Sequence, residues 1–89
     1  MNYEDYRPHS LGIDSTIRQS IQLIDKTMGQ ACLIVGEDRT LLGIVTDGDI
    51  RRFIMNGGDI NQPVSDVMNK TPLAIYENTT REDVLKIVR

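Results

Sequence analysis

The residues of this chain that are best placed to do chemistry lie where an apolar run meets a helix start, in the stretch Gly43 to Asp49 (GIVTDGD). Thr46 stands where an N-cap belongs, and Asp49 follows three residues later. The first amides of a helix lack partners within it, and its dipole favours negative charge, so a phosphate could dock there. The Asp49 carboxylate could face a sugar hydroxyl. This pattern predicts a site that holds a nucleotide by its phosphate and ribose.

Two other hypotheses fit the same residues. In the structural one, Thr46 and Asp49 only cap each other's backbone amides. In the enzymatic one, Asp47 and Asp49 form a carboxylate pair for acid–base chemistry or for magnesium. Residues two apart on a helix do not face each other, and no nucleophile, histidine or lysine accompanies the pair. A calcium loop is disfavoured because its later ligands are missing. The sequence therefore favours binding or capping over catalysis.

Composition describes a small acidic domain. The 89 residues suit one domain whose single core is only just sufficient, so its stability should depend on a partner. A net charge of -3 argues against nucleic acid as a partner. No stretch is long enough to span a membrane, and the polar first residues do not resemble a signal peptide, so we expect a cytoplasmic protein that does not bind membranes.

The chain has one cysteine and one histidine. Cys32 lies in the apolar run from Ala31 to Val35 and is expected in the core, whereas His9 lies beside Pro8 in a polar stretch. A disulfide framework and a cysteine-based metal site are both excluded, and we predict no metal ligands.

Periodicity predicts the first elements. Residues 10–13 could be extended, and Thr16 with Gln19 matches a capping box at the start of a helix that ends near Gly29. Apolar residues recur there at intervals of four, three and four, which is typical of an amphipathic helix. The members of this stripe are Ile17, Ile21, Ile24 and Met28.

The middle of the chain predicts a hairpin and a second helix. Residues 31–35 and 41–46 are two strands around a turn, each too apolar for a sheet with one solvated face, so both faces should be covered. The helix should run from Asp47 to about Asn56 and stop at Gly57-Gly58. Its inner side should hold Ile50, Phe53 and Ile54.

The end of the chain begins a repeat. Asn78-Thr79-Thr80 starts a further helix, and Thr79 lies 63 positions after Thr16. We divide the chain into a first motif over 10–58, a linker over 59–71 and the start of a second motif over 72–89. The apolar pattern of this further helix has not ended at Arg89, which predicts a fragment of a longer protein.

These residues resemble the cystathionine beta-synthase (CBS) domain. The resemblance rests on the strand, helix, strand, strand, helix order, on residues 43–52 (GIVTDGDIRR), and on PVSDVM at 63–68 followed by Thr71-Pro72. It implies an α+β fold of the CBS type (β-α-β-β-α), with one complete motif and the first strand and helix of a second. It also implies pairing of two motifs into a Bateman module and association into a homodimer.

The resemblance further implies an adenosine-containing ligand, such as AMP, ATP or S-adenosylmethionine, bound between the motifs. Carried over by position, Asp49 would hold the ribose hydroxyls and Thr46 the phosphate or ribose. Backbone and apolar groups would supply the remaining contacts, from Leu11, Gly12, Ile13, Ala31, Cys32 and Leu33. Arg51 and Arg52 could reach a phosphate, although a solvated face is the alternative for them.

The stretch 41–52 is similar to CBS modules attached to sugar-phosphate enzymes, chiefly sugar nucleotidyltransferases and arabinose-phosphate isomerases. Because Met1 stands just before the first motif, we expect a nucleotidyltransferase as the attached catalytic domain, with a sugar-phosphate isomerase as the alternative. The leading hypothesis is a regulatory nucleotide sensor that is not itself an enzyme. The other is a structural dimerisation module without a ligand.

Overall fold

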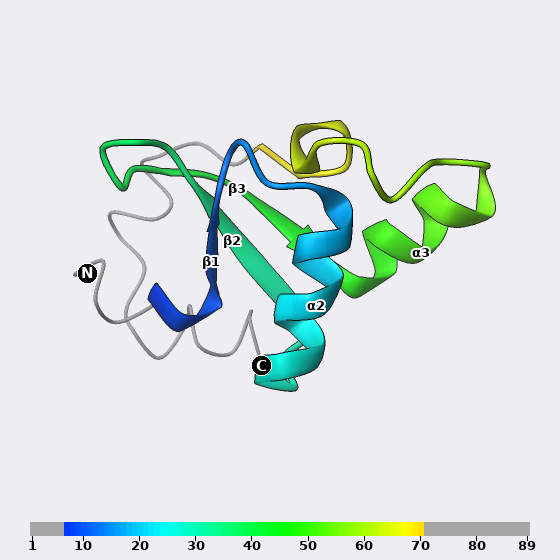
Figure 1. The fold of residues 1–89 in the computed structure, drawn as a ribbon, viewed down its shortest axis with the longest axis horizontal. Coiled ribbons are helices and arrows are strands. Elements are labelled where there is room, and N and C mark those ends of the chain that lie inside the picture. Colours follow the sequence, from blue (N-terminus) through cyan, green and yellow to red (C-terminus); the bar gives the residue numbers. More distant parts are fainter. Residues whose placement is uncertain (1–6, 71–89) are drawn as a thin grey trace.

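The computed structural model describes residues 7–70, which form a three-stranded sheet with two α-helices (Figure 1). Along the chain these are the 3₁₀ turn η1 (Arg7–His9), β1 (Ser10–Gly12), α2 (Ile17–Thr27), β2 (Ala31–Val35), β3 (Leu41–Thr46), α3 (Asp47–Met55) and the 3₁₀ turn η2 (Val64–Asp66). Strand β2 is central, parallel to β1 and antiparallel to β3. The α+β fold predicted from the sequence is confirmed.

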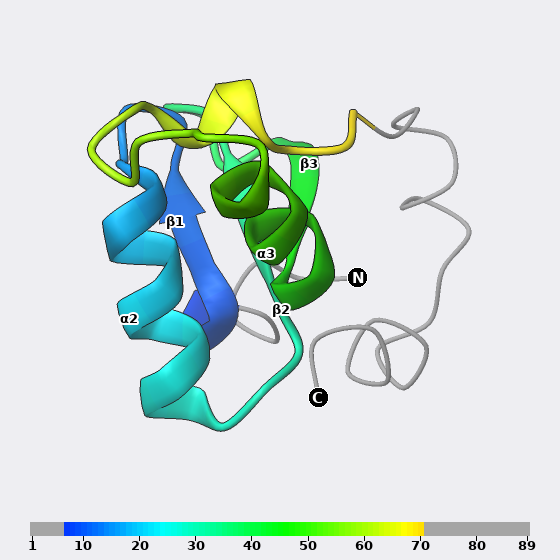
Figure 2. The ribbon, with the colours of Figure 1, turned by 90° about the vertical axis from the view of Figure 1, so that its right-hand side faces the viewer.

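The core lies between the sheet and the two helices, which cover the same face of it (Figure 2). All residues of β2 are buried, whereas those of β3 alternate between buried and half-buried, so the predicted covering of both faces is confirmed for β2 and wrong for β3. Side chains alternate along a strand, and those of Cys32 and Ile34 belong to the core beneath the helices, so Leu33 points to the opposite face. The buried members of this core are Ile17, Ile24, Cys32, Ile34, Val45, Ile50 and Val64.

Helix α2 begins with the predicted capping box. The Gln19 amide donates to Thr16 Oγ1 at 3.2 Å, and the Thr16 amide donates to Gln19 Oε1 at 2.8 Å. The helix ends near Gly29 as predicted, and its C-cap, Met28, adopts the left-handed conformation with φ 55°. Met28 is 90% exposed, so its predicted place on the buried stripe was wrong.

Helix α3 follows β3 without a loop, as predicted. Ile50 is buried, and Phe53 packs against the core and against Gly58. Ile54 is 46% exposed, so its predicted inward position was wrong. The chain turns away at Gly57, whose φ of 89° is readily adopted by glycine.

The described part of the linker, residues 59–70, packs against the first motif. At the start of α2, the amides of Ile17 and Arg18 donate to the carbonyls of Gln62 and Ile60 at 2.9 and 2.7 Å. At the sheet edge, Asn69 forms a β-bridge with Ile44 of β3. The strand predicted from residue 72 and the helix predicted from residue 79 lie outside the described residues.

Candidate functional site

The candidate site is the corner where β3 becomes α3. Thr46 is both the last residue of β3 and the N-cap of α3, and its Oγ1 accepts a hydrogen bond from the Asp49 amide at 3.1 Å. The same hydroxyl donates to Asp49 Oδ2 at 2.6 Å. The structural hypothesis is therefore correct for the Thr46 side chain, which caps the helix. The Asp49 carboxylate, in contrast, is bonded to side chains.

Three donors surround the Asp49 carboxylate. Oδ2 accepts from the Thr46 hydroxyl and from Asn69 Nδ2, each at 2.6 Å, and Oδ1 accepts from Arg52 Nη2 at 2.6 Å. The Asp49 side chain is only 17% exposed, whereas that of Asp47 is 58% exposed. Burial favours a higher pKa for Asp49, but hydrogen bonds from Thr46 and Arg52 and the Arg52 charge hold its pKa below the ordinary value. Asp49 is thus a fixed, ionised acceptor at neutral pH.

The first amides of α3 are partly committed within the chain. The Asp47 amide donates to the Gln30 carbonyl at 2.9 Å, and the Asp49 amide donates to the Thr46 hydroxyl. Two of the groups that were expected to receive a phosphate are therefore already bonded. Any phosphate at this corner would have to draw more on side-chain charge than on free amides.

The two arginines of α3 lie differently. Arg51 Nη2 pairs with Asp47 Oδ2 at 2.7 Å, with both side chains exposed, whereas Arg52 is the arginine that contacts Asp49. A Cβ added to Gly48 would be 3.5 Å from Arg52 Nη1, so this guanidinium lies over the first turn of the helix. Both arginines were predicted to reach a phosphate, and the structure places Arg52 beside Asp49 and Arg51 beside Asp47.

Among the predicted apolar contacts, those on β2 lie near this corner. Ala31 is the register partner of Thr46, and Cys32 is the partner of Val45. The Cys32 side chain belongs to the core, and burial raises the pKa of its thiol to about 12, so it is unreactive at neutral pH. Leu33 is fully buried on the other face of the strand. Ala31 is therefore the nearest of the three to Thr46 along the sheet.

The predicted contacts before the first helix lie elsewhere. Leu11 pairs with Ile34 and Gly12 with Val35, and the Ile13 amide donates to the Val35 carbonyl at 3.0 Å. Val35 is four residues from Ala31, or about 13 Å along an extended strand. The described residues thus bring Thr46, Asp49 and Ala31 together, and place Leu11, Gly12 and Ile13 at the opposite end of the sheet.

One residue of the corner went unrecognised in the sequence. Asn69 contacts Asp49 from 20 positions away, in a part of the linker that carries no local signal for this contact. Arg52, which was predicted together with Arg51 to reach a phosphate, lies three residues from Asp49, a spacing that brings side chains together on a helix. Spacing could have selected Arg52, whereas Asn69 needed the fold.

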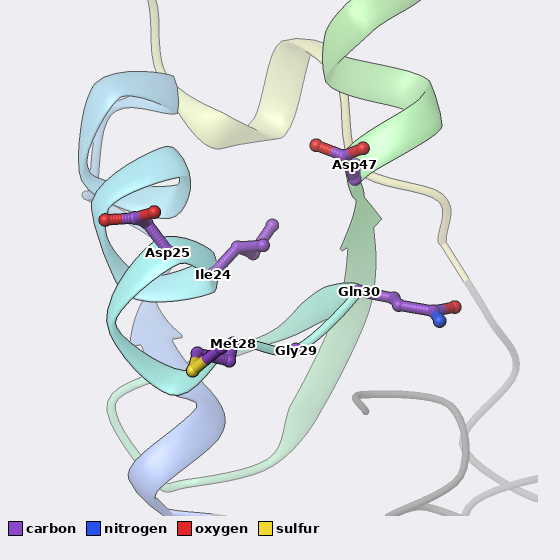
Figure 3. Close-up of a pocket in the computed structure, with 6 residues that line it drawn as sticks. All are labelled: Ile24, Asp25, Met28, Gly29, Gln30 and Asp47. Carbon is purple, nitrogen blue, oxygen red and sulfur yellow. The ribbon is translucent and has the colours of Figure 1, made fainter.

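A pocket of about 360 Å³ opens between the end of α2 and the start of α3 (Figure 3). Figure 3 shows Ile24 pointing into this space, whereas Asp25 and Met28 point away from it. The pocket is lined by Asp47 but by neither Thr46 nor Asp49, so it is distinct from the site predicted at Asp49. Its lining residues are Ile24, Asp25, Met28, Gly29, Gln30 and Asp47.

Within the described residues, metal-ligating side chains do not cluster and no helix could cross a membrane. Residues 7–70 contain no group of three or more histidine, cysteine, aspartate or glutamate side chains arranged to hold a metal ion. Within the same residues, neither helix has the length and apolar character needed to cross a membrane.

Similar proteins show how far the resemblance extends. Arabinose 5-phosphate isomerase KdsD of Francisella tularensis is 38% identical over 63 residues, which are 70% of this chain and 19% of that protein. The crystal structure of a CBS-domain-containing protein from Agrobacterium tumefaciens matches with a TM-score of 0.66 and 25% identity, over 70% of this chain and 48% of the other. The chain thus spans about a fifth of the isomerase and about half of the second protein.

A third match is a CBS domain protein from Pyrobaculum aerophilum, whose structure was solved in complex with AMP. It has a TM-score of 0.66 and 20% identity, over 88% of this chain and 66% of the other. At this identity the match supports a shared fold alone. The family model of the CBS domain matches residues 4–56, more than half of the chain. CBS domains are regulatory modules of a nucleotide-binding type, and this chain belongs to the CBS domain family.

Proposed function

We propose that the chain is a regulatory module that binds an adenosine-containing ligand of the AMP, ATP or S-adenosylmethionine class, with Asp49 as the acceptor for the ribose. The observation that carries this proposal is the state of the Asp49 carboxylate, which is ionised, largely shielded from solvent and held in place by three donors. A fixed carboxylate of this kind forms strong hydrogen bonds with hydroxyl groups.

The two oxygens of Asp49 differ in what they can still accept. A carboxylate offers about four lone-pair positions, two on each oxygen. Oδ2 already accepts from Thr46 and Asn69, whereas Oδ1 accepts only from Arg52. We therefore assign the ribose hydroxyls to Oδ1. Thr46 then acts by positioning the carboxylate, because its hydroxyl proton is directed to Oδ2.

Arg52 is the residue proposed for the phosphate. Its side chain is 68% exposed, so a phosphate can reach the guanidinium from solvent. A guanidinium can form two parallel bonds to a phosphate while staying near the first turn of α3. Arg51, paired with Asp47, serves as the natural comparison for this role.

The comparisons support different parts of the proposal. The AMP complex from Pyrobaculum aerophilum supports it at the level of the fold. The isomerase match favours a sugar-phosphate isomerase as the attached enzyme, and the relatives described above include no nucleotidyltransferase. We accordingly propose an isomerase context, with the second CBS motif and the catalytic domain as partners of this chain. Regulation would arise if the ligand binds one arrangement of these partners more tightly than another.

Titration calorimetry of the full chain tests the binding proposal. AMP, ATP and S-adenosylmethionine are each titrated into the wild type, Asp49→Asn and Asp47→Asn. Losing one charge-assisted interaction should weaken binding at least about tenfold in Asp49→Asn. The matched variant Asp47→Asn removes a carboxylate from the same helical turn and should bind like the wild type. Folded wild-type protein that releases no heat with any of the three ligands would contradict the proposal.

A dimerisation module without a ligand remains the second candidate. The observation in its favour is the exposure of Ile54 and Met55 at the end of α3, because exposed apolar side chains often lie at protein interfaces. Under this hypothesis Asp49→Ala should cost about 1–3 kcal/mol of stability, because it removes the acceptor for three side-chain donors, and no nucleotide should bind. Sedimentation of the full chain would then show a dimer with or without AMP.

A further inference from the structure

Asn69, in the last described part of the linker, pairs with β3 through its backbone. The Ile44 amide donates to the Asn69 carbonyl at 3.0 Å, and the Asn69 amide donates to the Ile44 carbonyl at 2.8 Å. The two chains approach closely here, since a Cβ on Gly43 would lie 2.8 Å from the Asn69 carbonyl oxygen. This contact fixes the direction in which the chain leaves the first motif.

The side chain of the same residue reaches the candidate site. Asn69 Nδ2 lies 2.6 Å from Asp49 Oδ2. Because an ionised carboxylate only accepts hydrogen bonds, the group that faces it must be the NH₂ of the amide. Asn69 thus contributes its backbone to the sheet edge and its side chain to the carboxylate proposed for the ribose.

We infer that Asn69 is a positioning residue that ties the Asp49 carboxylate to the linker between the two motifs. The inference rests on the proposed function only for the identity of the ligand. With Oδ2 held by Asn69, Oδ1 stays turned toward its exposed partner, Arg52. A ligand that needs this orientation must stabilise the pairing of the linker with β3, and the pairing must favour the ligand by the same factor. The first motif can thereby report its occupancy to whatever follows residue 70.

Amide hydrogen exchange in the full chain tests this link without any ligand. The amides of Ile44 and Asn69 report the pairing, and the Gly36 amide, which donates to the Thr40 carbonyl at 2.9 Å, reports the far end of the hairpin. Asp49→Ala should speed exchange at Ile44 and Asn69 about fivefold or more relative to Gly36, the lower end of typical couplings between sites. Asp47→Ala should leave this ratio unchanged. An unchanged ratio in folded Asp49→Ala overturns the inference.

A second measurement uses AMP. Asn69→Ala removes the donor, and Asn69→Asp keeps the size of the side chain but turns the donor into a second acceptor. Both variants should bind AMP about fivefold or more weakly than the wild type does. Lys70→Ala, which changes the next side chain, should bind AMP as the wild type does. AMP binding that is unaltered in Asn69→Ala overturns the inference and leaves the proposed function intact. Wild-type protein that binds no nucleotide overturns the proposed function, and the exchange ratio still decides the inference.

Discussion

The starts of α2 and α3 share a sequence pattern but differ in what they leave accessible. Each has a threonine N-cap with an oxygen-bearing side chain three residues later. At α2, Thr16 and Gln19 bond reciprocally to each other's amides, so the acceptor side chain is used on the backbone. At α3, Thr46 caps in the same way, but Asp49 directs both its oxygens to side chains.

The linker increases this difference, because it touches both helix starts in different ways. At α2 it supplies the carbonyls of Ile60 and Gln62, which bond the first amides of the helix. At α3 it supplies the amide side chain of Asn69, which bonds a carboxylate. The first amides of α2 are thus bonded to neutral carbonyls. The start of α3, in contrast, keeps a charged carboxylate whose Oδ1 can accept a further hydrogen bond. The comparison teaches that a capping pattern becomes a candidate binding site only when its acceptor is charged and is not used on the backbone.

Exchanging the two acceptors should have the largest effect. Asp49→Gln places in α3 the residue type that α2 has three positions after its N-cap, at Gln19. Helix α3 should therefore remain capped while the charged acceptor is lost. We expect nucleotide affinity to fall at least about tenfold, the cost of one charge-assisted bond. The measurement is calorimetric titration with AMP, together with urea denaturation to show that stability changes by no more than about 1 kcal/mol.

The reverse exchange, Gln19→Asp, is the control. It should create no second site, because the neighbouring amides of α2 remain bonded to the linker carbonyls. An additional equivalent of AMP bound by Gln19→Asp would contradict the distinction between the two helix starts. Unchanged affinity in Asp49→Gln would contradict the role of the charge.

The next effect comes from the contact between the linker and β3. A Cβ at Gly43 would meet the Asn69 carbonyl oxygen at 2.8 Å and the Met68 sulfur at 3.0 Å. Gly43→Ala should therefore push the linker away and cost about 1–3 kcal/mol, as overpacking does. Gly12→Ala is the matched control, since no atom lies within 4 Å of its added Cβ, and it should change stability by no more than about 0.5 kcal/mol. Equal unfolding midpoints in urea for the two variants would contradict this account.

Most of the fold could be predicted from local pattern. The capping box at Thr16, the hairpin over residues 31–46 and the helix from Asp47 lie where alternation, periodicity and turn residues placed them. The errors fall at helix ends, where Met28 and Ile54 continue an apolar spacing but lie beyond the surface that the sheet covers. Periodicity predicts which residues lie on one face of a helix, but it does not predict how far along the helix the sheet covers that face.

The site was predictable only as far as it is local. The pairing of Thr46 with Asp49 followed from their spacing, and the structure shows the two side chains in contact. Asn69 was not predictable, because its contact with Asp49 depends on how the linker returns to the edge of β3. The sequence also did not predict that Gly12 lies far from this corner. The order of residues does not show which end of β2 is paired with β1 and which end is paired with Thr46 of β3.

The two N-cap threonines should have similar effects on stability and different effects on binding. Thr16→Ala and Thr46→Ala should each cost about 1 kcal/mol in urea denaturation, because each removes a cap. Only Thr46→Ala should also weaken AMP binding, since its hydroxyl holds Asp49 Oδ2. Thr46→Ser keeps the hydroxyl and should restore both properties. A loss of affinity in Thr16→Ala as large as that in Thr46→Ala would show that binding follows stability alone.

The smallest expected effect is the dependence on pH. Burial would raise the pKa of Asp49, but bonds from Thr46 and Arg52 and the Arg52 charge lower it below the ordinary value. A carboxyl whose pKa is lower in the folded than in the unfolded chain contributes stability that is complete above the unfolded value, about 4, and is lost as the pH falls through the folded value. The free energy of unfolding should therefore differ less between the wild type and Asp49→Asn at pH values below about 4 than at neutral pH.

The start of α2 supplies the contrast for this measurement. Its cap consists of Thr16 and Gln19, neither of which titrates, so the difference between the wild type and Thr16→Ala should be constant over the same range of pH. Both variants keep Asp38, whose pKa is lowered by hydrogen bonds from Thr40, so its contribution cancels in each difference. Urea denaturation at several pH values gives both differences. If the Asp49→Asn difference were as constant as that of Thr16→Ala, the three donors around Asp49 would not be stabilising its charge, and the argument for a preorganised acceptor at α3 would fail.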